Sequence, residues 1–270
     1  MIPIGDSLRT RTIPYVNLAI IAVNILVFLY ELTLDSSRGL LLDPSRGLVE
    51  TYSELDRFFS DWGTIPACVS DLMGLDPEVA PQTLGTVCER SNNTLASPVT
   101  AMFMHAGWLH LLGNMLFLWI FGDNVEEGMG HLRYLIFYLV CGLGASMVHV
   151  LVNVDDIIPS IGASGAIAGV MAAYLVLYPR ATVAVLFPFF LIFWAAHVPA
   201  VLLIGVWFLM QVFSGAASIG ADVVGGGGGV AWFAHIGGFV LGLLLVHLFR
   251  RRKPSLRPIY PERRQRHWWE

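Results

Sequence analysis

The chain has 270 residues, of which 56% are hydrophobic and only 13% are charged, and its formal net charge at pH 7 is −4. A soluble domain carries about a quarter charged residues, so this composition excludes an ordinary soluble protein and favours one that crosses a membrane several times. The small net charge excludes no class of partner, because the positions of the charges matter more than their sum.

Six apolar blocks approach the roughly 20 residues that a helix needs to cross about 30 Å of hydrocarbon. In chain order they are residues 13–32, 108–122, 133–152, 163–178, 198–213 and 230–249. They predict an all-α polytopic membrane domain over residues 1–253, followed by a basic tail over 254–270. The first block is an uncleaved anchor in this prediction, because it is too long for a signal peptide and no small-residue cleavage site follows it.

The first two blocks are separated by a long loop, residues 34–107. Within it, apolar residues at a 4-3-4-3 spacing predict one face of a helix: Leu48, Tyr52, Leu55, Phe59 and Trp62. This face either packs on the protein or lies in the outer membrane interface. Cys68 and Cys88 also lie in the loop, and an oxidising compartment would allow a disulfide between them. Cys141 is inside the third block, where we expect a packing role.

Polar groups in the second block suggest function, because they are costly in a membrane. The motif HLLGN places His110 and Asn114 at i and i+4, on one helical face. Both side chains can donate hydrogen bonds. The pair therefore serves either as a polar clamp between helices or as donors to a developing oxyanion.

Ser164 begins the fourth block, in the stretch IPSIGASGAIAGV. The free N–H groups of a first helical turn carry partial positive charge and would stabilise an oxyanion beside Ser164. The small residues that recur along this block are equally typical of close helix packing. The soluble hydrolase elbow is excluded, because it needs glycine two residues after the serine and Ala166 stands there.

Two segments flank the fifth block. The apolar segment 183–194 is broken by Pro188, and we expect an interfacial connector there. After the fifth block, an outer loop over 214–229 ends in Gly225–Gly229. Five glycines have little intrinsic order, so this loop is either a lid that admits substrate or a simple linker.

His235 lies in the sixth block, in AWFAHIGGFVLG. Gly238 and Gly242 follow at i+3 and i+7, on the same helical face, and allow a close approach to another helix. If that partner is the fourth block, His235 comes within hydrogen-bond reach of Ser164. Imidazole suits the role of base for a serine hydroxyl near neutral pH. The alternative is a histidine that only packs.

Lysine and arginine predict the orientation. With six spans, all the basic flanking segments fall on one side, which should be cytoplasmic: Arg9, Arg11, Arg133, Arg180 and Arg250 to Lys253. The opposite side holds the acidic loop 34–107 with Asp155, Asp156 and Asp222. Both termini are therefore expected in the cytoplasm. The tail 254–270 either contacts the anionic inner leaflet or only fixes this topology.

In combination, these motifs resemble the rhomboid family of intramembrane serine proteases. The resemblance covers about residues 99–249 and includes MHAGWLHLLGN, GDNVEEGMG, GASG and AHIGG. The first block and FFSDWGTIPA look like bacterial members. The resemblance implies a six-helix rhomboid-like bundle in the bacterial inner membrane, whose site opens to the outer side and cleaves transmembrane proteins.

The resemblance also implies residue roles. Ser164 matches the nucleophile and His235 the general base of a dyad, while His110, Asn114 and the N–H of Ser164 match oxyanion-stabilising positions. The structural positions are His105, Glu126, Gly162, Gly165, Gly238 and Gly242. No metal, cofactor or nucleic acid is implied, and the oligomeric state stays open.

One departure concerns the histidine. Some members carry an aromatic residue one turn after the serine that stacks on the base, and Ala168 stands there. The orientation of His235 must come from elsewhere, with Trp232 and Phe233 as candidates. The alternative function is a rhomboid-fold protein that binds client helices without cleaving them. A transporter is a weaker alternative, because no internal repeat of broken helices is visible.

Overall fold

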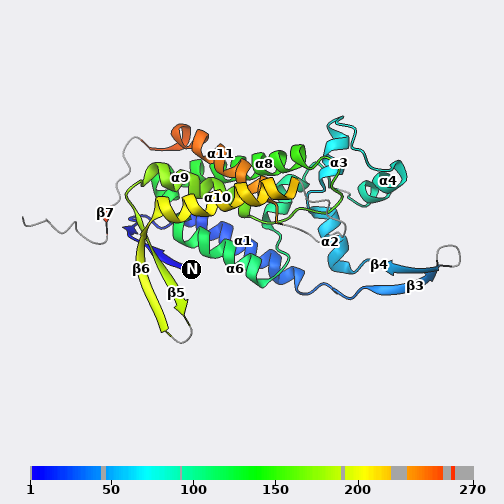
Figure 1. Ribbon diagram of the computed structural model, residues 1–270, viewed down its shortest axis with the longest axis horizontal. Coiled ribbons are helices and arrows are strands. Elements are labelled where there is room, and N and C mark those ends of the chain that lie inside the picture. The colour runs from blue at the N-terminus through cyan, green and yellow to red at the C-terminus, as the bar shows by residue number, and fades with distance from the viewer. Residues whose placement is uncertain are drawn as a thin grey trace, which may run out of the picture.

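The computed structural model describes residues 2–43, 47–91, 93–189, 192–219, 230–251 and 257–258. All six predicted blocks are helical in it (Figure 1). The helices are α1 (Tyr15–Glu31), α6 (Trp108–Phe117), α8 (His131–Val152), α9 (Ser164–Leu177), α10 (Ala200–Ile219) and α11 (Trp232–Phe249). α6 continues through the π-helix η2 (Leu118–Gly122) into α7 (Asp123–Met129). The second and fifth helices are thus longer than predicted, because the chain stays helical beyond the apolar blocks.

The described helices include three, α8, α10 and α11, that are long and apolar enough to cross a membrane. A fourth is counted if the pair 97–103 and 108–129, bent by 92°, forms one span. α1 and α9 are apolar but shorter, with 17 and 14 residues. The protein is therefore a helical membrane protein, and the count of six spans stays a prediction.

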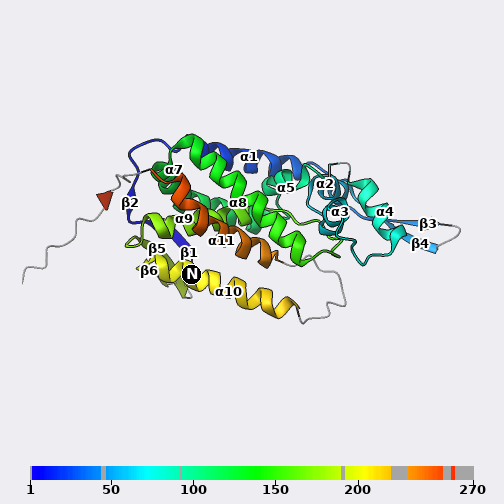
Figure 2. The ribbon, with the colours of Figure 1, turned by 90° about the horizontal axis from the view of Figure 1, so that it is seen from above.

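α9 is the most enclosed helix of the bundle. Every residue from Gly165 to Tyr174 is buried. It runs beside α8 and α11 (Figure 2), and large aromatic side chains such as Phe121, Phe137 and Tyr174 fill the core. The residues of α9 are small toward its N-terminus, so its neighbours approach its backbone there.

Glu126 on α7 holds the beginning of α1 in place. Pro14, at the N-cap of α1, provides no side-chain cap. Instead the Glu126 carboxylate accepts the backbone N–H groups of Val16 at 3.1 Å and Asn17 at 2.7 Å, and it also contacts His131 Nδ1. Asn17 in turn donates to the carbonyl of Leu118 in η2 at 2.9 Å. A carboxylate suits the positive end of a helix, so the expected structural acid acts as a cap supplied by another helix.

A small sheet lies at one end of the bundle. Its antiparallel order is β1 (Ile2–Asp6), β5 (Thr182–Phe189), β6 (Ile192–Pro199), and the hairpin of β5 and β6 extends away from the helices (Figure 1). The predicted connector over 183–194 contains β5 from Val183 onward and the start of β6, and its position at the membrane interface stays a prediction. Val183 and Val185 are buried while their neighbours are partly exposed, the period of a strand. A two-residue pairing joins β2 (Leu8–Arg9) to β7 (Arg257–Pro258).

The long loop gathers at the opposite end of the bundle (Figure 1). It contains the hairpin β3 (Gly39–Asp43) and β4 (Gly47–Thr51), then α2 (Glu54–Trp62), α3 (Pro66–Leu72), α4 (Pro81–Arg90), α5 (Ser97–Thr100) and the 3-10 helix η1 (Ala101–Phe103). The predicted helix over 48–62 was wrong in its first half, since Leu48 lies in β4 and Tyr52 precedes the helix. Leu55, Phe59 and Trp62 do lie in α2.

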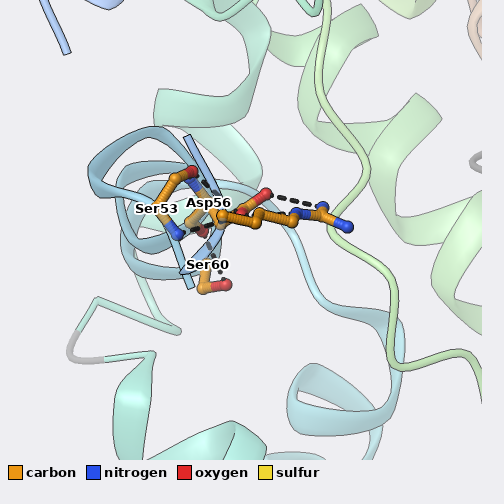
Figure 3. Close-up of polar contacts among 4 residues, drawn as sticks. Ser53, Asp56 and Ser60 are labelled. Carbon is orange, nitrogen blue, oxygen red and sulfur yellow. Dashed lines mark hydrogen bonds and ion pairs between the residues drawn. The ribbon is translucent and has the colours of Figure 1, made fainter. Parts of the chain in front are cut away.

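Ser53 explains why α2 begins where it does. Its Oγ accepts the Asp56 N–H at 3.0 Å, and the Asp56 carboxylate accepts the Ser53 N–H at 3.1 Å, a reciprocal capping box (Figure 3). Arg38 donates two hydrogen bonds of 2.9 Å to that carboxylate and lowers the pKa of Asp56 to about 2. Because of this cap, α2 begins at Glu54, although the apolar spacing extends back to Leu48.

Cys68 and Cys88 form a disulfide that joins α3 to α4, with an S–S distance of 2.06 Å. Cys141 is a free, buried cysteine in α8. The segment Gly225–Gly229 and most of the tail 254–270 lie outside the described residues, so the lid and the inner-leaflet contact stay predictions.

Replacing Glu126 with alanine should lower the stability of the fold. The change leaves the N–H groups of Val16 and Asn17 without an acceptor, at an expected cost of about 1–3 kcal/mol. Thermal unfolding of the detergent-solubilised chain measures this, with the exposed Glu89→Ala as the control. Equal melting temperatures for Glu126→Ala and wild type would contradict the capping role.

Candidate active site

The first helical turns of α9 and α11 bring a serine and a histidine together. His235 Nε2 lies 2.7 Å from Ser164 Oγ, across 71 residues of sequence. Ser164 is the first residue of α9, so its own N–H lacks a partner within the helix. His235 is buried, whereas Ser164 is partly exposed. The pair has the contact that transfer of the hydroxyl proton to imidazole requires.

Glycines set the distance between the two helices. A Cβ at Gly238 would overlap the carbonyl oxygen of Gly165, and one at Gly242 would overlap that of Gly169. On the other side of α9, a Cβ at Gly165 would come within 2.6 Å of Ala145 Cβ. α9 is therefore held tightly between α8 and α11, and only glycine fits at these contacts.

Gln211 on α10 orients the histidine from its other nitrogen. Its Oε1 lies 2.7 Å from His235 Nδ1, and the Gln211 side chain is buried. The Trp207 ring, one turn earlier on α10, lies 5.7 Å from the imidazole at 39°, and the Trp232 ring meets it edge-on at 6.5 Å. These contacts can orient the His235 ring in place of an aromatic residue at position 168.

Trp232 and Phe233 are the residues that the sequence predicts for this role, whereas Gln211 is not predicted. Trp232 does contact the ring, whereas Phe233 lies toward Gly215 of α10 and has no described ring contact with His235. A signal was available, since Gln211 is a polar residue within the apolar run WFLMQVF. A polar residue within an apolar span suggests function, as histidine or serine does.

His110 packs beside the backbone that leads into Ser164. A Cβ at Gly162 would come within 2.7 Å of His110 Cε1 and Nε2 and 3.7 Å of Ser164 Oγ. Gly162 also has φ of +126°, which side chains rarely adopt. The absence of a side chain at Gly162 thus leaves space between His110 and Ser164. The His105 ring supports His110 edge-on at 4.9 Å, and Glu31 accepts the backbone N–H of His105.

Asn114 is buried one turn after His110 on α6. Its Nδ2 has no hydrogen-bond partner among the described residues. A buried amide donor without an acceptor is costly unless a ligand or water satisfies it. Asn114 follows His110 by one turn on α6, the helix whose His110 packs against Gly162 before Ser164.

The long loop shapes the segment before Ser164. Thr64 and Ser160 exchange two backbone hydrogen bonds, of 3.0 and 2.7 Å. Ala67 N–H donates to the carbonyl of Asp156, and Gly162 N–H donates to that of Ala101. Loop residues from two separate stretches therefore fix the path of the chain into α9.

A sequence profile of the rhomboid domain matches residues 92–252, more than half of the chain. The chain belongs to the rhomboid family.

Several curated relatives agree with this. The rhomboid-like protein 11 of Arabidopsis thaliana, chloroplastic, is 34% identical over 159 residues, which cover 57% of this chain and 52% of the relative. The mitochondrial rhomboid protein 1 of Saccharomyces cerevisiae is 30% identical over 154 residues, covering 55% and 40%. The rhomboid-like protease 5 of Toxoplasma gondii is 32% identical over 165 residues, covering 56% and 17%. The matched part of this rhomboid is thus about half or less of each relative.

Two further observations concern metal binding and the cellular location of the relatives. The described residues contain no group of three or more His, Cys, Asp or Glu side chains that could hold a metal ion. The names of the first two relatives place them in a chloroplast and a mitochondrion, so they lend no support to the expected bacterial inner membrane.

Replacing Gly238 with alanine should separate His235 from Ser164. The new Cβ overlaps the Gly165 carbonyl, so α11 must shift, at a cost of about 1–3 kcal/mol. The rate at which a fluorophosphonate labels Ser164 should fall by about tenfold or more, because His235 no longer reaches the hydroxyl proton that it must accept. Gly205→Ala on α10 is the matched control, because a Cβ there meets nothing within 4 Å. Equal labelling of both variants would refute the spacing role of Gly238.

Proposed function

We propose that the chain is an intramembrane serine endopeptidase that cleaves transmembrane proteins with a Ser164–His235 dyad. The observation that carries the proposal is the 2.7 Å contact between His235 Nε2 and Ser164 Oγ. Membership of the rhomboid family supports it at the level of the family. A protein that only bound client helices would have no need of a base beside this hydroxyl.

The chemistry follows from the contact. His235 Nε2 takes the Ser164 proton as Oγ attacks the peptide carbonyl, and the carbonyl oxygen becomes an oxyanion. The intermediate collapses when His235 returns that proton to the leaving amine, which departs and leaves an acyl-serine. A water molecule, activated by the same imidazole, then hydrolyses the ester and restores both residues.

Three donors are available for the oxyanion. The N–H of Ser164 is free of a helical partner, the Asn114 amide is buried without an acceptor, and His110 lies across Gly162 from Ser164. Donors of this kind stabilise the charge that develops in the transition state.

Hydrolysis also needs water at the site. The short length of α9 allows water to reach one of its ends. Its 14 residues rise about 21 Å, less than the roughly 30 Å hydrocarbon layer, so one end lies below a surface. Ser164 is at the end packed against the acidic loop 34–107, whereas Arg180 follows the other end. By the positive-inside rule, we propose that the site opens outward and both termini are cytoplasmic.

The substrate is proposed to be another transmembrane helix. The carbonyls of a helix are engaged in hydrogen bonds, so its peptide bonds are accessible only after local unwinding. Residues with poor helix propensity near the outer membrane surface favour that unwinding. The proposal includes no cofactor and no nucleic acid.

The proposal is tested by incubating the purified chain in proteoliposomes with a model transmembrane substrate. Ser164→Ala and His235→Ala should each abolish cleavage, and Ser164→Ala should also abolish fluorophosphonate labelling. The exposed Leu244→Ala on α11 is the control and should cleave normally. Cleavage that survives Ser164→Ala would refute the mechanism, and a wild type that binds the substrate without cutting would favour the client-binding alternative.

Asn114→Ala should separate catalysis from binding. Loss of one oxyanion donor is expected to lower kcat by about 10²-fold with little change in KM, because the donor engages the charge only in the transition state. Steady-state kinetics on the same substrate measure both constants, with Gly113→Ala as the control, where a Cβ meets nothing within 4 Å. A variant that changes KM alone would assign Asn114 to substrate binding instead.

A further inference from the structure

We propose that Gln211 is the positioning residue of the dyad, and that its neutral amide selects the imidazole tautomer with a free Nε2. This inference rests on the proposed Ser164–His235 chemistry. The supporting contact is the 2.7 Å distance between Gln211 Oε1 and His235 Nδ1. An amide oxygen can only accept, so Nδ1 must carry the proton. Nε2, which faces Ser164 Oγ, is then the unprotonated nitrogen that a base requires.

The surroundings determine which end of the amide faces the histidine. Gln211 Nε2 donates a long hydrogen bond of 3.4 Å to the carbonyl of Trp207, one turn earlier on α10. That carbonyl can only accept, so it turns the NH₂ group away from the imidazole and leaves Oε1 toward Nδ1. With the amide reversed, Nδ1 would accept and the proton would lie on Nε2, which could not take the serine proton.

The ring is also held by its faces and edges. Trp207 tilts over the imidazole at 5.7 Å and Trp232 meets it edge-on at 6.5 Å. Trp207 and Gln211 are at i and i+4, so one face of α10 provides both contacts. Gln211 therefore fixes the rotation of the ring within its plane, whereas the tryptophans limit its tilt.

The contact also couples the dyad to α10. Ser164 and His235 belong to helices α9 and α11, which are locked together by backbone contacts at Gly238 and Gly242. α10 packs on α11 more loosely, and many of its side chains are exposed. A displacement of α10 would thus remove the partner of Nδ1 without moving Ser164 or His235.

The test compares variants that differ in the acceptor. Gln211→Met keeps the length of the side chain but has no amide oxygen, Gln211→Leu is a second acceptor-free variant, and Gln211→Glu keeps an acceptor. Met210→Leu, on the exposed side of the same turn, is the control. All are assayed as the full chain in proteoliposomes, below their measured melting temperatures, for kcat, KM and the rate of fluorophosphonate labelling.

We expect the two acceptor-free variants to lower kcat and the labelling rate by about 10- to 100-fold, with KM within about twofold of wild type. Gln211→Glu should recover most of this loss. Wild-type kcat in both acceptor-free variants would overturn the proposal. Equal losses in Met, Leu and Glu variants would also overturn it, since they would reflect only the shape of the side chain.

The outcome is distinguishable from failure of the proposed function. Cleavage that survives Ser164→Ala refutes the dyad itself, whatever Gln211 does. Loss of cleavage in Ser164→Ala together with full activity in Gln211→Met refutes only the positioning role.

Discussion

The close approach of α9 and α11 is the constraint on which the rest of the molecule depends. At Gly238 and Gly242 the two backbones are in direct contact, so no side chain separates them. In a membrane no hydrophobic driving force brings helices together, and association relies on such packing and on interhelical hydrogen bonds. The same small residues that allow the packing place His235 within 2.7 Å of Ser164. The close packing of the helices and the Ser164–His235 contact thus have the same cause.

Polar contacts between distant segments fix the chain at both ends of the bundle. Glu126 caps α1 from α7, and Thr64 and Ala101 in the long loop bind the segment that leads into Ser164. Each of these hydrogen bonds joins residues far apart in the sequence. They provide partners for backbone groups at helix ends and in the loop, which have none within a helix.

A neutral residue beside the histidine suits these surroundings. A carboxylate would stabilise a protonated imidazole more strongly, but a buried charge is costly in a site enclosed by apolar helices. The neutral amide of Gln211 can orient the imidazole through a hydrogen bond without adding a buried charge. Trp207 and Trp232 then restrict the ring as an aromatic residue at position 168 would. Ala168 is instead fully buried in the packed helix.

Much of the fold was predictable from the sequence, because the membrane imposes a length and an apolar composition on each helix. The six blocks, the buried position of Cys141 and the pairing of glycines with the serine and the histidine follow from local pattern. The helix predicted from Leu48 failed where a capping box at Ser53 overrode the apolar spacing. The strands within the connector over 183–194 were not predicted, because they depend on pairing of β5 with β6 and with β1, which is distant in sequence.

The sequence by itself therefore determined which residue types are available: a serine at the start of one helix, a histidine in another, and glycines on the faces between them. Only the tertiary structure decided how they are oriented. The partner of His235 Nδ1 comes from a third helix, and the unpaired Asn114 amide and the space at Gly162 depend on a fourth. Local periodicity reports which side of a helix is apolar, but it carries no information on which helix faces which, or at what rotation.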